Sequence, residues 1–146
     1  MLDKRDVVII SSIDWDFNWQ GPQEIALRLA ESGNRVFFVE NLGVRAPQLK
    51  DLPRVVKRLK KWVLSNLAFW RESHNKSDIP NNLFVFSPLA FPPFSASPGK
   101  KLNRSFFIPK IKAAIQRQGF DNVVILTFIP SDTVNELIDQ IRDPDS

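Results

Sequence analysis

The sequence contains no cysteine and only one histidine, and both shortages narrow the chemistry open to it. Without cysteine there is no disulfide scaffold, no zinc site built from thiolates and no cysteine nucleophile. The single histidine, His74, excludes a histidine-rich metal centre and a catalytic centre with two imidazoles. Its polar neighbours predict a solvent-exposed, non-catalytic side chain. We assign no general base.

Long apolar runs are also missing. No segment approaches the roughly 18 consecutive apolar residues that a membrane-spanning helix needs. Near the N-terminus, the apolar run at residues 7–10 is too short for the core of a secretion signal. Both absences predict a protein of the cytoplasm.

Glycine is scarce, with five residues at positions 21, 33, 43, 99 and 119. This spacing contains neither G-x-G-x-x-G nor G-x-x-x-x-G-K-[ST], the glycine-rich loops that hold nucleotide phosphates. A conventional dinucleotide site is therefore not expected, and no resident cofactor is predicted. Gly21 at the start of a helix would still leave free backbone N–H groups, which form a generic anion site.

What is present suits one globular domain. The chain has 146 residues, of which 43% are hydrophobic and 25% charged, and its net charge is +4. The charge is unevenly spread, because residues 42–118 carry a net charge of +12 and the remainder a net charge of −8. The middle of the chain is thus a candidate for contact with phosphate, nucleic acid or a membrane surface.

The hydrophobic pattern alternates strands with helices. Short apolar runs with β-branched residues predict buried strands at 6–11, 35–40, 83–87 and 122–127. Helices are expected from Gly21-Pro22, from about Pro109 and from the segment around Pro130, where Thr133 and Glu136 have capping-box spacing. Gly33 and Gly119 would end the first two, and the first has an apolar stripe of Ile25, Ala26, Leu29 and Ala30. This order predicts an α/β, Rossmann-like fold with a mostly parallel sheet and helices on both faces.

Ligands of open parallel sheets bind outside the carboxyl ends of the strands, which nominates the loops there. The loop after the first strand is dense in acids, amides and indoles, which suit sugar recognition through stacking and hydroxyl hydrogen bonds. The alternative is a hydrophobic loop anchor surrounded by solvated acids. Glu40, which ends the second strand, is expected to make a structural hydrogen bond or an acceptor contact rather than to hold a ribose. The candidate substrate-binding residues are Asp14, Trp15, Asp16, Trp19, Gln20, Gly21, Thr127 and Ser131.

The segment 51–70 follows a helical period, with an apolar stripe and many cations beside it. It is either an outer helix with a solvated charged face or a helix that lies on an anionic membrane surface. Nucleic acid is not expected as a partner, because no DNA- or RNA-binding motif accompanies the charge. The candidate membrane-surface residues are Arg54, Lys57, Arg58, Lys60, Lys61 and Trp62.

Several stretches together resemble a known family. They are VVIISSID at 7–14, WDFNWQGPQEIA at 15–26, LAESGNRVFFVEN at 29–41, FSPL at 86–89, Pro92-Pro93 and VILTFIPS at 124–131. They are similar to the start of bacterial GT-B glycosyltransferases of the group 1, family 4-like type, which act in teichuronic acid and other surface-polysaccharide synthesis. The tryptophan-rich run is the more specific part, and the resemblance extends over nearly the whole chain.

The resemblance implies that residues 1–146 form a Rossmann-like N-terminal, acceptor-side domain, which is incomplete, and that the C-terminal donor domain is absent. The full enzyme would transfer a sugar from a nucleotide sugar to a hydroxyl of a glycan or lipid-linked acceptor, without a metal. The isolated chain is expected to be inactive and peripheral to the inner membrane face. The alternative is a non-enzymatic α/β binding module that docks on a membrane or partner through its basic middle segment.

Overall fold

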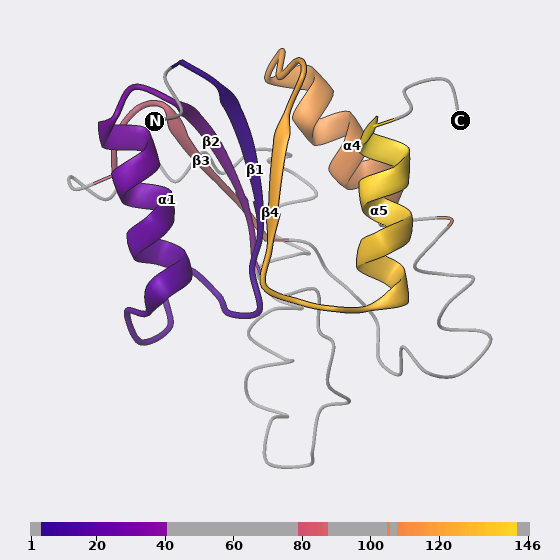
Figure 1. Ribbon diagram of the computed structural model, residues 1–146, viewed down its shortest axis with the longest axis horizontal. Coiled ribbons are helices and arrows are strands. Elements are labelled where there is room, and N and C mark those ends of the chain that lie inside the picture. The colour runs from indigo at the N-terminus through magenta and orange to yellow at the C-terminus, as the bar shows by residue number, and fades with distance from the viewer. Residues whose placement is uncertain (1–3, 41–78, 88–104, 106–107, 143–146) are drawn as a thin grey trace, which may run out of the picture.

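The computed structural model describes residues 4–40, 79–87, 105 and 108–142, and these form an α/β fold. Four parallel strands make one sheet, and the described residues contain three helices (Figure 1). The expected strands are all present and parallel, each within two residues of its predicted bounds. The elements are β1 (Asp6–Ile10), α1 (Gly21–Glu31), β2 (Arg35–Val39), β3 (Leu83–Phe86), α4 (Ile108–Arg117), β4 (Val124–Thr127) and α5 (Asp132–Arg142).

The strand order is β3-β2-β1-β4. Strands β2 and β3 are added on one side of β1, and β4 is added on the other side. This order is consistent with a Rossmann-like sheet, in which ligands bind where the direction reverses. The reversal lies between β1 and β4, whose register pairs Val7 with Val124 and Ile10 with Thr127. The carboxyl ends of these two strands therefore flank the position where a ligand is expected.

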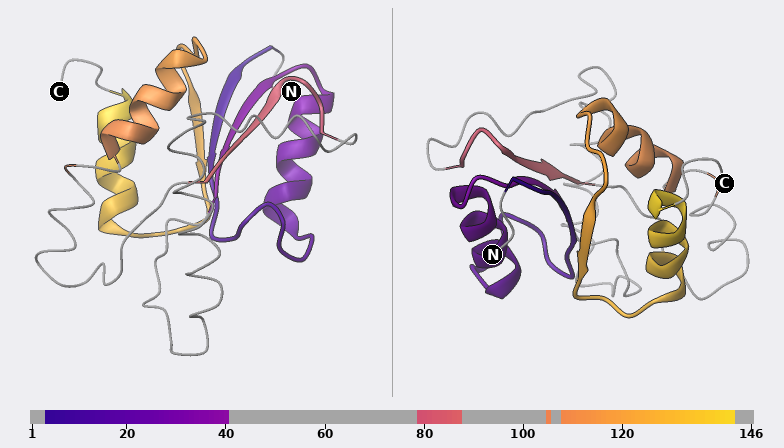
Figure 2. Two further views of the ribbon diagram at one scale, coloured as in Figure 1. Left: turned by 180° about the vertical axis from the view of Figure 1, so that it is seen from behind. Right: turned by 45° about the horizontal axis from the view of Figure 1, so that its top comes forward.

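The sheet is covered on both faces, as the sequence predicts (Figures 1 and 2). Helix α1 packs on one face, where Ala26 and Ala30 join a core with Val7, Ile9 and Phe38. Helices α4 and α5 pack on the other face, against the alternate side chains of the same strands. Because both faces are buried, β1 and β2 have apolar residues at successive positions rather than an alternating pattern.

Gly33 and Gly119 end α1 and α4 as predicted, with φ of +88° and +64°. After α1, the Gly33 amide donates to the Ala30 carbonyl (2.9 Å) and the Asn34 amide to the Leu29 carbonyl (3.2 Å). The corresponding two bonds follow α4, so both helices end in a Schellman motif. The residue after the C-cap has a left-handed backbone conformation in both helices, which explains why glycine occupies this position.

Two local predictions were wrong. The N-cap of α5 is Ser131, whose Oγ accepts the Val134 N–H (3.3 Å), and not Thr133, which lies inside the helix. The stripe of α1 was expected to include Ile25, but this side chain is 37% exposed. The residues of α1 that face the sheet are Gln23, Ala26 and Ala30. The small alanines let the helix backbone approach the sheet, and Gln23 has polar partners in the loop.

The segment 51–70, with all six candidate membrane-surface residues, and His74 lie outside the described residues. Within the residues that are described, no helix has the length and apolar character needed to cross a membrane.

Candidate functional site

The loop of residues 11–20 leaves β1 at the carboxyl edge of the sheet, the lower edge in Figure 1, and returns to start α1. Its first residue, Ser11, is fully buried and still pairs with β2 through a hydrogen bond to the Val39 carbonyl (2.9 Å). The Ser11 hydroxyl accepts the Ile13 N–H (3.1 Å), which turns the chain away from the strand. The loop is thus joined rigidly to the sheet at its start.

Gln23, in the first turn of α1, holds the remainder of this loop. Its side chain is fully buried, and its Oε1 accepts the Gln20 N–H (3.0 Å). Its Nε2 donates to the carbonyls of Asp14 (3.3 Å) and Asn18 (3.4 Å). One buried amide group therefore bonds to three backbone groups of the loop, which also satisfies its own polar atoms. This role of Gln23 was not predicted from the sequence, although a glutamine at the third helical position is the known partner of an N-cap.

Trp15 is an anchor for the loop rather than an exposed platform. It is only 7% exposed, and its ring meets that of Phe38 edge to face at 5.0 Å. Its backbone N–H donates to Oε1 of Glu40 (2.8 Å), and the other carboxylate oxygen of Glu40 accepts the Ser87 hydroxyl. Glu40 thus links the loops that follow β1 and β3, which confirms the structural hydrogen bond predicted for it.

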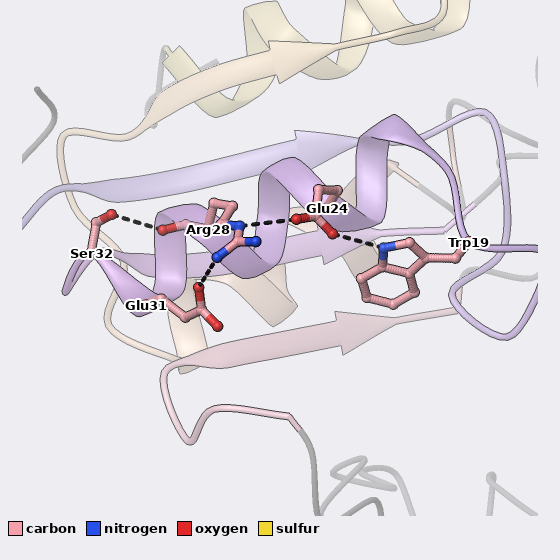
Figure 3. A network of polar contacts seen from close by, with 5 residues as sticks. All are labelled: Trp19, Glu24, Arg28, Glu31 and Ser32. Atoms are coloured by element: carbon pink, nitrogen blue, oxygen red, sulfur yellow. Dashed lines mark hydrogen bonds and ion pairs between the residues drawn. The ribbon is translucent and has the colours of Figure 1, made fainter.

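Trp19 has the opposite environment. Its ring is 52% exposed, and it meets the Trp15 ring edge to face, with centroids 5.5 Å apart and planes at 81°. Its indole Nε1–H donates to Oε2 of Glu24 on α1 (2.8 Å), as Figure 3 shows. Trp19 is therefore an exposed aromatic surface whose polar edge is already bonded within the protein.

Glu24 belongs to a line of charged groups along α1 (Figure 3). Its Oε1 accepts from Arg28 Nε (2.9 Å), and Arg28 also contacts Oε2 of Glu31 (3.2 Å). The hydrogen bond from Trp19, followed by that from Arg28, holds the pKa of Glu24 below its usual range. The same carboxylate raises the pKa of Arg28. Both shifts favour the charged forms of the two side chains.

Gln20 and Gly21 form the start of α1. Gln20 is the N-cap residue, with extended backbone angles, and its carbonyl accepts the Glu24 N–H (3.2 Å). A Cβ on Gly21 would meet no atom within 4 Å, so a side chain would fit there. Both residues therefore serve to begin α1 at the carboxyl edge of the sheet.

On the other side of the reversal, the loop after β4 remains bonded to β1 through the Phe128 N–H and the Ile10 carbonyl (3.1 Å). The Thr127 hydroxyl accepts the Ile129 N–H (3.2 Å), and Ser131 caps α5. These two candidates therefore stabilise backbone turns. Phe128 between them is 37% exposed, a feature that the sequence analysis did not single out.

The structure places all eight sequence-predicted substrate-binding residues at one edge of the sheet. Trp15 is buried, Asp14 and Ser131 are half-buried, and the exposed ones are Asp16, Trp19, Gln20, Gly21 and Thr127. Phe17, which is 43% exposed, and Phe128 are further exposed aromatic residues in the loops at this edge. Among the residues that the structure describes, no group of acids and histidines could hold a metal ion.

Comparisons with protein families, with curated proteins and with solved structures found no match to this chain.

Proposed function

We propose that this chain is the acceptor-binding half of a glycosyltransferase of the GT-B type, which the resemblance of its sequence suggests. One observation carries the proposal. A half-exposed tryptophan, Trp19, is held in the loop between β1 and α1, at the edge where open parallel sheets bind their ligands. Exposed apolar surface that the fold holds in place usually serves an interaction.

The chemistry of the edge suits a sugar better than a phosphate. The face of an indole stacks on the C–H face of a pyranose ring, and carboxylates accept hydrogen bonds from its hydroxyls. Asp14 and Asp16 on the same loop supply such acceptors. A phosphate in this position would meet the two carboxylates and would have no glycine-rich loop to hold it.

The proposed reaction is the transfer of a sugar from a nucleotide sugar to a hydroxyl of the bound glycan or lipid-linked acceptor. The donor would bind to a complementary domain, which is the proposed partner of this chain. In the full enzyme, helix N-termini and basic side chains would stabilise the departing diphosphate, as in metal-independent transfer. We therefore propose no resident metal or cofactor.

The acceptor role is tested by NMR on the purified chain labelled with 15N. The probes are cellotriose, triacetylchitotriose, maltotriose and mannotriose at up to about 10 mM, which reaches the weak affinities typical of single sugar contacts. We expect at least one of them to shift the Trp19 indole resonance. Trp19→Leu should abolish binding, whereas Ile25→Ala, which removes a comparably exposed apolar side chain from the surface of α1, should not. If none of the four probes shifts this resonance, the proposal is wrong.

The donor role is tested separately. We expect UDP- and GDP-sugars to bind no tighter than about 1 mM, the level of a single phosphate contact at a helix N-terminus. Hydrolysis or transfer of these sugars by the chain alone should be undetectable. Micromolar binding would place the donor site in this half and would overturn the division into acceptor and donor domains.

A further inference from the structure

The indole N–H of Trp19 already has a hydrogen-bond partner within the protein. Its Nε1–H is bonded to Glu24 at 2.8 Å, and its ring meets that of Trp15 edge to face at 81°. Two contacts from different directions therefore define the orientation of a side chain that is 52% exposed. Exposed side chains without such contacts move freely between rotamers.

The acceptor of the Trp19 hydrogen bond belongs to a helix that is packed against the sheet. Glu24 lies on α1, which packs against the sheet through the fully buried Ala26 and the nearly buried Ala30. Arg28, one turn further along α1, bonds to the second oxygen of Glu24 at 2.9 Å and is itself held by Glu31 at 3.2 Å (Figure 3). The carboxylate is therefore fixed on one side by α1, and it fixes the ring on the other.

We propose that Glu24 is the positioning residue of the saccharide site and orients the Trp19 ring without touching the sugar itself. The inference rests on the proposed function, because it gives the oriented ring its use. Fixing the ring before binding removes the entropy that a free side chain would lose when a ligand stacks on it. Glu24 is thus expected to increase affinity through Trp19 alone.

The same bond defines the kind of ligand that Trp19 accepts. Because the indole N–H is occupied, the ring cannot donate to a hydroxyl and offers only its face. The ligand is therefore a pyranose that presents a continuous C–H face, and a linear polyol with similar hydroxyl groups should not bind. Sorbitol is the matched negative probe for the four trisaccharides.

The orientation is tested without any ligand. The chain contains four tryptophans, so its 15N spectrum should contain four indole N–H signals, and Trp19→Phe identifies the one from Trp19. In Glu24→Ala this signal should move upfield and its exchange with water should become at least several times faster. Glu24→Gln keeps an acceptor oxygen and should retain the signal near its original position. Glu31→Gln, which alters the same row of charges without touching Trp19, serves as the matched control.

The affinity is then measured with whichever trisaccharide binds the unaltered chain. Glu24→Ala should weaken binding about three- to tenfold, the effect of freeing one large side chain. Glu24→Gln should restore affinity to within about twofold, and Glu31→Gln should leave it unchanged. Sorbitol should leave the Trp19 signal in place for every variant.

The outcomes separate the two proposals. An indole signal that does not respond to Glu24→Ala overturns the positioning role, whatever the sugars do. Equal affinity of Glu24→Ala and the unaltered chain also overturns it. If Glu24→Ala changes the signal but no trisaccharide binds the unaltered chain, Glu24 holds the ring but the saccharide site, and with it the positioning role, is refuted.

Discussion

The two ends of the sheet both bond polar side chains to the backbone, but they differ in how much aromatic surface they leave exposed. At the amino end, Asn34 is fully buried and joins the Arg5 N–H (3.0 Å) to the Leu29 carbonyl (2.9 Å). Asn82 donates to the carbonyls of Ala30 (2.8 Å) and Asn34 (2.6 Å). These two side chains connect the end of α1 and the loop after it to the residues that precede β1 and β3. Their partners are backbone groups of the protein itself.

Arg35 closes the same end of the sheet. Its guanidinium lies over the Phe120 ring, 4.5 Å from the centroid, and contacts Asp6 at 3.5 Å. It also donates to the carbonyls of Gln118 and Gly119. The amino end is thus a structural network in which a cation, a ring and several carbonyls satisfy one another.

At the carboxyl end, polar side chains also bond to the backbone, but the aromatic side chains around them remain exposed. Gln23 and Glu40 hold the loop after β1, while Trp19 and the neighbouring Phe17 keep about half of their surface in water. An exposed apolar surface is costly for a protein that does not use it. The amino end therefore stabilises the fold, and the exposed aromatic surface at the carboxyl end supports the proposal of a ligand site there.

The largest effect is expected at the residue that serves both stability and the loop. Gln23→Ala removes the hydrogen bonds that the Gln20 N–H and two carbonyls make to this side chain and opens a cavity, and it should lower the free energy of unfolding by about 3 kcal/mol. The loop should loosen as well, which increases the exposure of Trp15. Urea unfolding and the wavelength of tryptophan emission measure the two effects. Unchanged emission would contradict the role of Gln23 in holding the loop.

Asn34→Ala separates the amino end from the site. Removing a fully buried amide with two backbone partners should lower the free energy of unfolding by about 2 kcal/mol. Asn34→Asp, which keeps only the acceptor for the Arg5 N–H, should also destabilise the protein. The Trp19 indole signal should stay in place in both variants. A change in that signal would show that the two ends are coupled.

Trp19→Ala tests the opposite end. The side chain is half-exposed, so its loss should lower the free energy of unfolding by only about 1 kcal/mol, the value of one aromatic pair with Trp15. Saccharide binding should be lost. Thermal unfolding, compared with that of Asn34→Ala, checks the order of the two effects. A loss of stability as large as that of Asn34→Ala would make Trp19 a structural residue.

The smallest effect is a change with pH. Because hydrogen bonds from Trp19 and Arg28 lower the pKa of Glu24 in the folded protein, its stabilising contribution is present above the pKa of the unfolded chain. It disappears as the pH falls through the lower, folded value. The Trp19 indole signal should therefore titrate with a midpoint below the usual range for glutamate. Glu24→Gln should remove this transition, and a midpoint above that range would contradict the assignment.

The sequence alone predicted most of the regular structure. Continuous apolar runs indicated the four strands, and glycine at positions 33 and 119 indicated the ends of two helices, because both signals depend on neighbouring residues only. The rule for parallel sheets also located the candidate substrate-binding residues at one edge. Ser131 was correctly chosen as a residue of that edge, but its local role as the α5 cap was assigned to Thr133 instead.

Only the tertiary structure decided which of these residues remain accessible. Trp15 and Trp19 are the same residue four positions apart, yet one is buried against Phe38 of β2 and the other is half-exposed. The order β3-β2-β1-β4 places the loops after β1 and β4 together, although more than 100 residues separate them in sequence. Gln23 is buried because three backbone groups of a folded loop surround it. Contacts between distant segments determine burial and strand order, and no local pattern contains them.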